Sequence, residues 1–247
     1  MIDGVYGCYF SLAMILSAAN FNPEVLGKSK VSPWLMAIAS PLCQSLLPSY
    51  FRTIQITGQE HIPKQGPVII APTHRSRWDA LLVSLALGRG VSGRDLRFMV
   101  TATEVTGIQG WFIRRLGGFP VDLKRVESSS LIYSVALLQQ GEMLVIFPEG
   151  GIFRDRQVHR LKRGIARIAL EVVAQEPTSP IQILPVAIDY DDPYQSWGCA
   201  VQIRIGRGIV VNQFDPRAMK TSSEALTQTL FRALQETDEK QPVGLLV

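Results

Sequence analysis

The chain has 247 residues, of which 47% are hydrophobic and 19% charged, and it carries a formal net charge of +4. This composition excludes a disordered chain, and the length suits one sizeable α/β core. The positive charge favours anionic partners such as phosphorylated metabolites or acidic lipid headgroups, while the lack of any nucleic-acid-binding motif argues against nucleic acid.

Cysteine and histidine are sparse and scattered. The three cysteines, Cys8, Cys43 and Cys199, are too far apart for a C-x-x-C metal site and odd in number, so we expect a reducing compartment. The three histidines form no H-E-x-x-H motif, so we expect no metal site and no cofactor.

Residues 1–50 are predicted to form an N-terminal helical hairpin. The stretches 4–23 and 31–51 contain no charged side chain and approach the ~20 residues that a membrane-spanning helix needs. Both are interrupted by prolines and polar residues, which argues against a span. No basic residues precede the first apolar stretch, so we expect no secretory signal.

The second stretch has an apolar stripe at helical spacing, formed by Trp34, Leu35, Ile38, Leu42 and Leu46. Lys28 and Lys30 lie in the link between the two stretches. This pattern favours a hairpin that lies on the cytoplasmic side of a membrane, with aromatic residues and lysines at headgroup level. Packing against the soluble core and a true span are the alternatives.

From residue 51 to residue 247, short apolar runs alternate with amphipathic helices. This alternation predicts one α/β domain with a mixed, largely parallel central sheet flanked by helices. We expect strands at 52–57, 67–72, 96–101, 118–122, 143–147, 181–188 and 200–211. We expect helices at about 77–88, 105–116, 127–139, 161–174 and 222–237.

The segment "APTHRSRWDALL", residues 71–82, places His74 in the turn after a buried strand, where open α/β sheets bind ligands. Two interpretations of Asp79 are open. It can act only as the last residue of a helix capping box that begins at Ser76. It can also accept a hydrogen bond from one imidazole nitrogen, which leaves the other nitrogen free as a general base.

A second segment, "MLVIFPEGGIFRD", runs from an apolar strand into a glycine turn at residues 150–151. Such a turn lets backbone amides approach a ligand closely. Basic residues follow it, namely Arg154, Arg156, Arg160, Lys162, Arg163 and Arg167. They are either the solvated face of the next helix or part of a phosphate site at that helix's N-terminus.

Four blocks in order resemble the glycerolipid acyltransferase family, the glycerol-3-phosphate and 1-acylglycerol-3-phosphate acyltransferases. The first is the HxxxxD motif from His74 to Asp79, and the others are "GGFPVDLKR" at 117–125, "FPEG" at 147–150 and "LPVAI" at 184–188. The resemblance covers about residues 65–190, and the N-terminal hairpin is similar to the membrane-docking helices of that family.

The resemblance implies transfer of an acyl group from acyl-CoA or acyl-carrier protein to 1-acylglycerol-3-phosphate (lysophosphatidic acid), which makes phosphatidic acid in phospholipid biosynthesis. His74 and Asp79 would be the catalytic pair. By resemblance Glu149, Gly150 and Gly151 shape the acceptor site, and Pro185 lies in the block associated with the acyl donor. Glycerol-3-phosphate or another lysolipid or alcohol as acceptor, and a membrane-docking protein without catalysis, are the open alternatives.

Two arginines that the family uses for the acceptor phosphate are absent. Leu123 stands where the second block of the family usually ends in an arginine, and Gly151, Ile152 and Phe153 stand where the third block usually continues Thr-Arg-Ser. Lys124, Arg125 and Arg154 are the expected substitutes. A strand alternates faces, so an offset of one residue is not automatically equivalent.

Overall fold

The computed structural model describes residues 29–121 and 128–239 of the chain. Within them, eight strands form one sheet. The strands are β1 (Thr53–Thr57), β2 (Val68–Pro72), β3 (Leu96–Thr101), β4 (Gly118–Val121), β5 (Met143–Val145), β6 (Gln182–Tyr190), β7 (Ala200–Ile205) and β8 (Ile209–Val210). The helices are α2 (Pro33–Tyr50), α3 (Asp79–Leu87), α4 (Arg89–Ser92), α5 (Gly107–Arg115), α6 (Ser128–Gln139), α7 (Gly164–Gln175) and α8 (Met219–Glu239).

The sheet is mixed and largely parallel, as the sequence predicts. Its order is β1-β7-β6-β2-β5-β3-β4, with β8 also paired to β6. The strands from β6 to β4 are parallel to one another. β7 and β8 run antiparallel to β6, and β1 runs parallel to β7. β2 and β5 therefore lie near the centre, and their carboxyl ends meet at one edge of the sheet.

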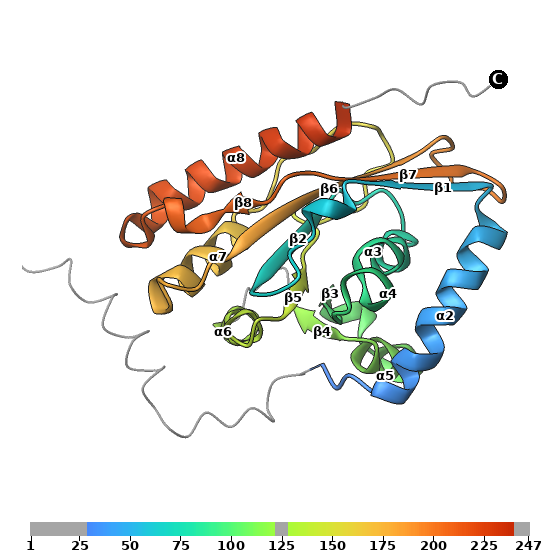
Figure 1. Ribbon diagram of the computed structural model, residues 1–247, viewed down its shortest axis with the longest axis horizontal. Helices are drawn as coiled ribbons and strands as arrows, with labels where there is room; N and C mark the ends of the chain where they lie inside the picture. The colour runs from blue at the N-terminus through green and yellow to red at the C-terminus, as the bar shows by residue number, and fades with distance from the viewer. Residues whose placement is uncertain (1–28, 122–127, 240–247) are drawn as a thin grey trace, which may run out of the picture.

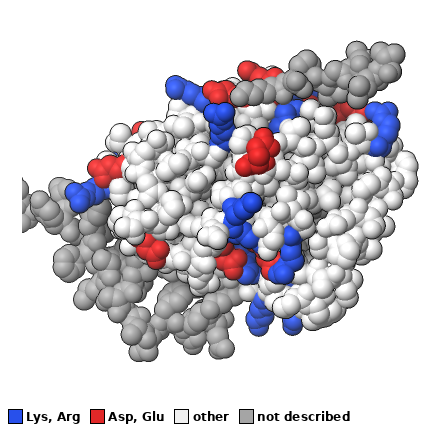
Figure 2. Space-filling view, in the orientation of Figure 1, with Lys and Arg blue, Asp and Glu red and all other residues white. Residues whose placement is uncertain are grey.

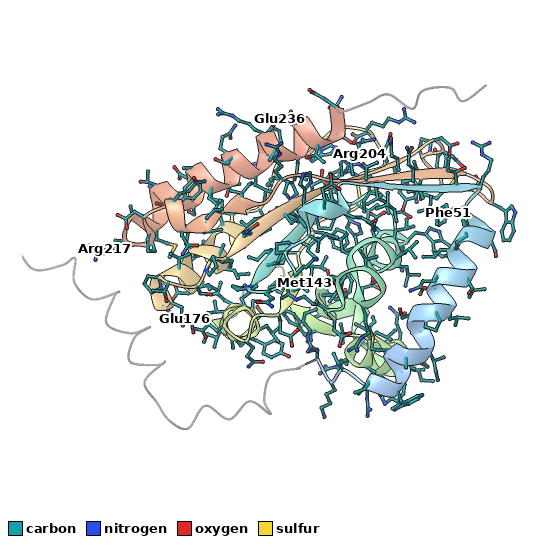
Figure 3. All side chains as sticks on the ribbon, in the orientation of Figure 1. Phe51, Met143, Glu176, Arg204, Arg217 and Glu236 are labelled. Carbon is teal, nitrogen blue, oxygen red and sulfur yellow. The ribbon has the colours of Figure 1, made fainter. Side chains whose placement is uncertain are left out.

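Helices cover both faces of the sheet (Figure 1). The fully buried strand β2 turns Ile69 and Ala71 toward the face covered by α6, α7 and α8. Val68 and Ile70 turn toward the opposite face, covered by α2 and α3. Met143 of β5 belongs to the buried cluster on this second face of the sheet. Phe51 belongs to the same cluster and lies where α2 meets β1 (Figure 3). Both faces of β2 are buried because helices cover each side, as parallel sheets require.

Most predicted elements lie within a few residues of the observed ones, but the expected strand at 200–211 is wrong as a single element. The chain breaks at Gly206–Gly208 into β7 and β8, which pair with successive parts of β6. The expected helix at 77–88 also begins later, at Asp79, and α4 follows it after Gly88.

The break explains how a proline fits inside the central strand β6. Pro185 is buried, and its carbonyl accepts a hydrogen bond from Gly206 N–H at 2.9 Å. A residue in a strand directs its N–H and its C=O to the same side, so the missing N–H of Pro185 faces the gap between β7 and β8. No ladder bond is lost there, because the break leaves no strand to receive one.

Only the second half of the predicted N-terminal hairpin can be described, because residues 1–28 lie outside the described residues, so the hairpin stays a prediction. α2 packs one side against α3 and buries Leu47 in the core. The opposite side exposes Trp34, Ile38 and Leu42. Over residues 29–121 and 128–239, no helix combines the length and apolarity needed to cross a membrane.

We expect Gly206→Ala to lower the free energy of unfolding by about 1–3 kcal/mol. A Cβ at Gly206 would lie 2.4 Å from Thr237 Oγ1 and 2.9 Å from Pro185 Cγ, and the proline ring cannot move aside. Urea denaturation measures the change. Gly164→Ala is the control, because an added Cβ there meets no atom within 4 Å. Equal stability of the two variants would contradict the account of the strand break.

Candidate active site

His74 sits at the carboxyl edge of the sheet because Thr73 fixes the end of β2. Thr73 N–H donates to the carbonyl of Val186 at 2.9 Å, and Thr73 Oγ1 accepts from Ile188 N–H at 2.9 Å. The His74 carbonyl in turn accepts from Phe153 N–H at 2.8 Å. The turn is thus tied both to β6 and to the loop that follows β5.

The imidazole of His74 is hydrogen-bonded to the carboxylate of Asp79. Nδ1 of His74 lies 2.9 Å from Oδ2 of Asp79. The Asp79 side chain is fully buried, whereas the His74 side chain is 20% exposed. The histidine can therefore meet a substrate, while its carboxylate partner is shielded from water.

Asp79 accepts three further hydrogen bonds. The N–H groups of Arg75 and Ser76 donate to Oδ2 at 2.6 and 2.8 Å. The hydroxyl of Tyr190, at the end of β6, donates to Oδ1 at 2.6 Å. Burial, together with the nearby Asp79 carboxylate, raises the pKa of Tyr190, so this phenol keeps its proton and remains a donor.

Of the two interpretations of Asp79 that the sequence leaves open, the geometry excludes the one in which Asp79 acts only as a capping residue. The bond from Ser76 N–H to Asp79 is one half of a capping box, and Ser76 Oγ accepts from Trp78 N–H at 3.2 Å. The same carboxylate also holds the imidazole. Capping α3 and orienting His74 are therefore functions of one side chain.

The hydrogen-bond pattern determines the tautomer of His74. Asp79 offers only acceptor atoms to its four donors, so Nδ1 of His74 carries the proton and Nε2 keeps its lone pair. The ring also stacks on Phe147 at 4.1 Å between centroids, which limits its rotation. An imidazole held in this way is suited to act as a general base through Nε2.

Glu149 is a second buried carboxylate, and it faces away from solvent. Its oxygens accept from His74 N–H at 2.8 Å, from His159 N–H at 2.8 Å and from Arg75 Nη1 at 2.9 and 3.2 Å. Arg75 also donates to the carbonyl of Gln157 at 2.9 Å. The side chain of Glu149 therefore joins the loop after β5 to the turn after β2.

The glycine turn lies next to this carboxylate. Gly150 has a φ of +72°, in the left-handed region that favours glycine. A Cβ at that position would come within 3.2 Å of Lys162 Cε, so the stem of Lys162 passes directly over the turn. Lys162 N–H donates to the carbonyl of Pro148 at 2.7 Å, which fixes this approach.

A cavity of about 820 Å³ opens beside His74. Its wall is mostly apolar and includes residues from α2, α3, β3, α5, α6 and α7. Gly150, Gly151 and Lys162 line it together with His74. A cavity of this size and character fits an elongated apolar ligand whose polar end lies near the histidine.

Three cations line the cavity, and they differ in their partners. Arg89 is held by Asp95 through two bonds of 2.8 and 2.6 Å, which neutralises it. Arg77 lies 3.4 Å from a Glu104 oxygen and is largely exposed. Among the described residues, no carboxylate lies within ion-pair distance of the Lys162 ammonium group. Lys162 is thus the cation most available to an anionic ligand.

The structure brings some of the sequence-predicted residues together but not others. His74, Gly150 and Gly151 line the cavity. Asp79 and Glu149 do not line it, but they bind the imidazole and the backbone N–H of His74. The guanidinium group of Arg154 lies 5.4 Å from the centre of the Tyr194 ring and is not part of the cavity wall.

The remaining predicted contacts also lie apart from the cavity or cannot be placed. Pro185 is buried in the sheet and lines no part of the wall. Lys124 and Arg125 fall in segment 122–127, outside the described residues, so their roles stay predictions. No group of three or more His, Cys, Asp or Glu side chains in the described part of the chain could hold a metal ion.

Sequence reasoning missed two residues of the site, Phe147 and Tyr190, and did not single out a third, Lys162. Phe147 belongs to the FPEG block, but nothing in that block indicates stacking on a histidine. Lys162 is one of six basic residues between positions 154 and 167, and its position just before α7 was the available signal. Tyr190 follows the LPVAI block by two residues and gives no sequence signal of its contact with Asp79.

A family model described as acyltransferase matches residues 53–189, more than half of the chain. The chain belongs to the acyltransferase family. This match, together with the relatives described next, confirms the resemblance to glycerolipid acyltransferases. The HxxxxD turn, the glycine turn and β6 up to Asp189 lie inside the matched region.

Two relatives illustrate the range of this family. Mitochondrial glycerol-3-phosphate acyltransferase 1 of Sus scrofa is 30% identical over 177 residues, covering 65% of this chain. The 1-acyl-sn-glycerol-3-phosphate acyltransferase of Streptococcus pneumoniae is 26% identical over 188 residues, covering 75% of this chain. The matches span only 21% and 62% of these two relatives.

The fold is shared with a solved acyltransferase. The crystal structure of the 1-acyl-sn-glycerophosphate (LPA) acyltransferase PlsC from Thermotoga maritima superposes with a TM-score of 0.60 at 20% identity. The match covers 85% of this acyltransferase and 82% of the other chain. It supports the mixed, largely parallel sheet flanked by helices.

We expect Glu149→Gln to lower the free energy of unfolding by about 3–5 kcal/mol, because buried Arg75 would lose its charged partner. The amide nitrogen of the glutamine would also face N–H donors. Denaturant unfolding measures this loss. The matched control is Glu224→Gln, whose partner Arg163 is half-exposed, with an expected cost below about 1 kcal/mol. Similar losses in both variants would contradict the role given to Glu149.

Proposed function

We propose that this acyltransferase moves a fatty acyl group from acyl-CoA or acyl-carrier protein to the free hydroxyl of 1-acylglycerol-3-phosphate, which makes phosphatidic acid. One observation carries the proposal. The His74–Asp79 pair opens onto a large apolar cavity, and Lys162, which has no carboxylate partner among the described residues, lines the cavity wall. A base, an apolar channel and a positive charge match the hydroxyl, acyl chain and phosphate of such an acceptor.

The reaction begins when Nε2 of His74 removes the proton from the acceptor hydroxyl. The oxygen attacks the thioester carbonyl carbon, and Asp79 stabilises the imidazolium that forms. The backbone N–H of Gly151 stabilises the negative charge on the carbonyl oxygen, because the N–H of Gly150 is donated to the Phe147 carbonyl at 3.2 Å. The carbon–sulfur bond then breaks, the thiolate takes the proton from His74, and the ester is complete.

The acceptor phosphate is held at the glycine turn by Lys162, with Arg77 as a second contact at the rim. The Lys162 stem lies over Gly150, and Lys162 lines the wall of the cavity that carries the turn. Lys124 and Arg125, in segment 122–127, are proposed as further phosphate contacts. Because Arg154 lies outside the cavity wall, we assign the phosphate to Lys162 instead.

Glu149 and Pro185 contribute indirectly in this scheme. Glu149 has all of its acceptor atoms directed at protein donors, so we assign it to positioning the His74 backbone and not to touching the substrate. Pro185 keeps β6 in register at the strand break and thereby places Tyr190 against Asp79.

The transfer is direct and needs no acyl-enzyme. Cys43, on α2, is the cysteine that lines the cavity in the described residues. Burial raises the pKa of its thiol, so little of the reactive thiolate is present at neutral pH. The apolar wall around Cys43 instead serves to hold an acyl chain.

Glycerol-3-phosphate is the second candidate acceptor, and the similarity to glycerol-3-phosphate acyltransferase 1 favours it. Lys162 would hold its phosphate in the same way, and the cavity would then accommodate only the donor chain. In either case we place the enzyme on a membrane surface facing the cytoplasm, with the exposed side of α2 in the interface. Acyl transfer to both acceptors, with both donor types, separates the two candidates.

We expect His74→Ala to lower the rate of acyl transfer by about 10²–10⁴-fold or more, because the general base is removed. The loss is measured with radiolabelled donor and purified protein. His159→Ala is the matched control, since His159 pairs with Asp155 and lines no part of the His74 cavity. Retained activity in His74→Ala, or equal losses in both variants, would refute the proposed mechanism.

We expect Lys162→Ala to raise the KM for the phosphorylated acceptor by about 10–100-fold, because a charge-assisted hydrogen bond to the phosphate is lost. Steady-state kinetics at saturating donor measure this. Arg154→Ala is the comparison and should change the KM by no more than about twofold. A large KM effect at Arg154 with none at Lys162 would reverse the assignment of the phosphate contact.

A further inference from the structure

Helix α5 turns its apolar residues outward. Ile108 is 80% exposed, Trp111 44% and Phe112 45%. These residues stand three and four positions apart, so they form one face of the helix. The opposite face carries Gly110 and Ile113 and packs inward, where Gly110 lies against the Val105 backbone. An outward apolar face of this kind on a nine-residue helix marks a surface for an apolar partner.

This face is continuous with the exposed side of α2. The segment that leads into α2 is bonded to the last turn of α5, through Lys30 N–H to the Arg114 carbonyl at 2.8 Å and Ser32 N–H to the Arg115 carbonyl at 3.0 Å. α5 accordingly lies beside the first turn of α2 (Figure 1). Trp34, 58% exposed, begins the apolar stripe of α2 only two residues after Ser32.

The charges around this surface favour an anionic partner. α2 contains no charged residue, and in Figure 2 the right side of the molecule, where α2 lies, is largely white, with basic and acidic side chains lower down in the view. Arg114 and Arg115 lie in the last turn of α5, and the Arg115 guanidinium lies 5.1 Å from the centre of the Trp111 ring. Within the described residues, neither arginine has a carboxylate partner.

Aromatic and aliphatic residues flanked by arginines are typical of the interface of a membrane with anionic headgroups. We propose that the outward face of α5 is a second membrane-docking element, which enters the headgroup region together with α2 and binds anionic lipid through Arg114 and Arg115. The docked surface is formed by Ile108, Trp111 and Phe112 on α5 and Trp34 and Ile38 on α2.

The location of this surface gives it a role in the reaction, and this part of the inference rests on the proposed function. The inward sides of the same two helices line the cavity of His74, with Met36 and Cys43 from α2 and Ile113 from α5. A bilayer against the outward sides would therefore be separated from the cavity by one layer of helices. A lipid acceptor held in that bilayer would then lie close to the cavity wall that these helices form.

The first test is binding of the full chain to vesicles of phosphatidylcholine with 30% phosphatidylglycerol, measured by flotation without substrate. We expect Ile108→Glu to lower the partition coefficient by about tenfold or more, since this side chain would otherwise be buried in lipid. Val210→Glu makes the same charge change on β8, away from α2 and α5, and should bind like the unaltered chain. Equal binding by both variants would overturn the proposal.

The second test measures whether the Trp111 side chain itself enters the bilayer. In a variant with Trp34, Trp78 and Trp197 changed to Phe, we expect the remaining Trp111 fluorescence to be quenched by lipids brominated near the headgroup end of the acyl chains. Vesicle binding without quenching of Trp111 would overturn the proposal. A change in Trp111 fluorescence on adding acyl-carrier protein, or on self-association of the chain, with no change on adding lipid would also overturn the proposal.

These tests do not depend on catalysis. Vesicle binding is measured without turnover, so an inactive enzyme would refute the proposed function and leave the docking result intact. Loss of the docking result with full acyl transfer would refute only the role of α5. His74→Ala should bind vesicles like the unaltered chain, because His74 lies in the cavity and not on the docked surface.

Discussion

A buried carboxylate that must be surrounded by donors organises this site. Asp79 has no exposure to water, and an ionised carboxylate without partners in that position would cost several kcal/mol. Four donors converge on it, from His74, Arg75, Ser76 and Tyr190. Satisfying this one group therefore fixes the turn after β2, the start of α3 and the end of β6 at once, and it leaves Nε2 of His74 as the only ring nitrogen able to accept a proton.

Glu149, the second buried carboxylate, is also surrounded by donors, and it follows β5, which pairs with β2 in the sheet. Glu149 binds the backbone of His74 and the side chain of Arg75, so the loops after β2 and β5 cannot shift independently. The glycine turn and Lys162 thereby keep a set position relative to the imidazole. In the proposed mechanism this rigidity favours acyl transfer, because the proposed base, the proposed anion contact and the cavity are positioned before substrate arrives.

Much of this arrangement could be predicted from residues alone, for identifiable reasons. The strands of the parallel core are apolar runs bounded by turns, and the HxxxxD spacing places both functional groups in a single turn. The basic run after the glycine turn could be predicted as a possible phosphate site, but the choice of Lys162 within it could not, since Lys162 reaches Gly150 only through the fold of the loop between them. The same holds for the break at Gly206 and for the outward face of α5, because periodicity predicts a helix but does not tell which side of it faces the core.

The tautomer of His74 tests the central claim most directly. Nitrogen-15 NMR of the uniformly labelled protein at neutral pH, with the His74 signals assigned by their loss in His74→Ala, reports which ring nitrogen carries the proton. The account predicts a protonated Nδ1 and an unprotonated Nε2. A proton on Nε2 with a bare Nδ1 would contradict it, since Asp79 could not then receive the bond and His74 could not act as the base.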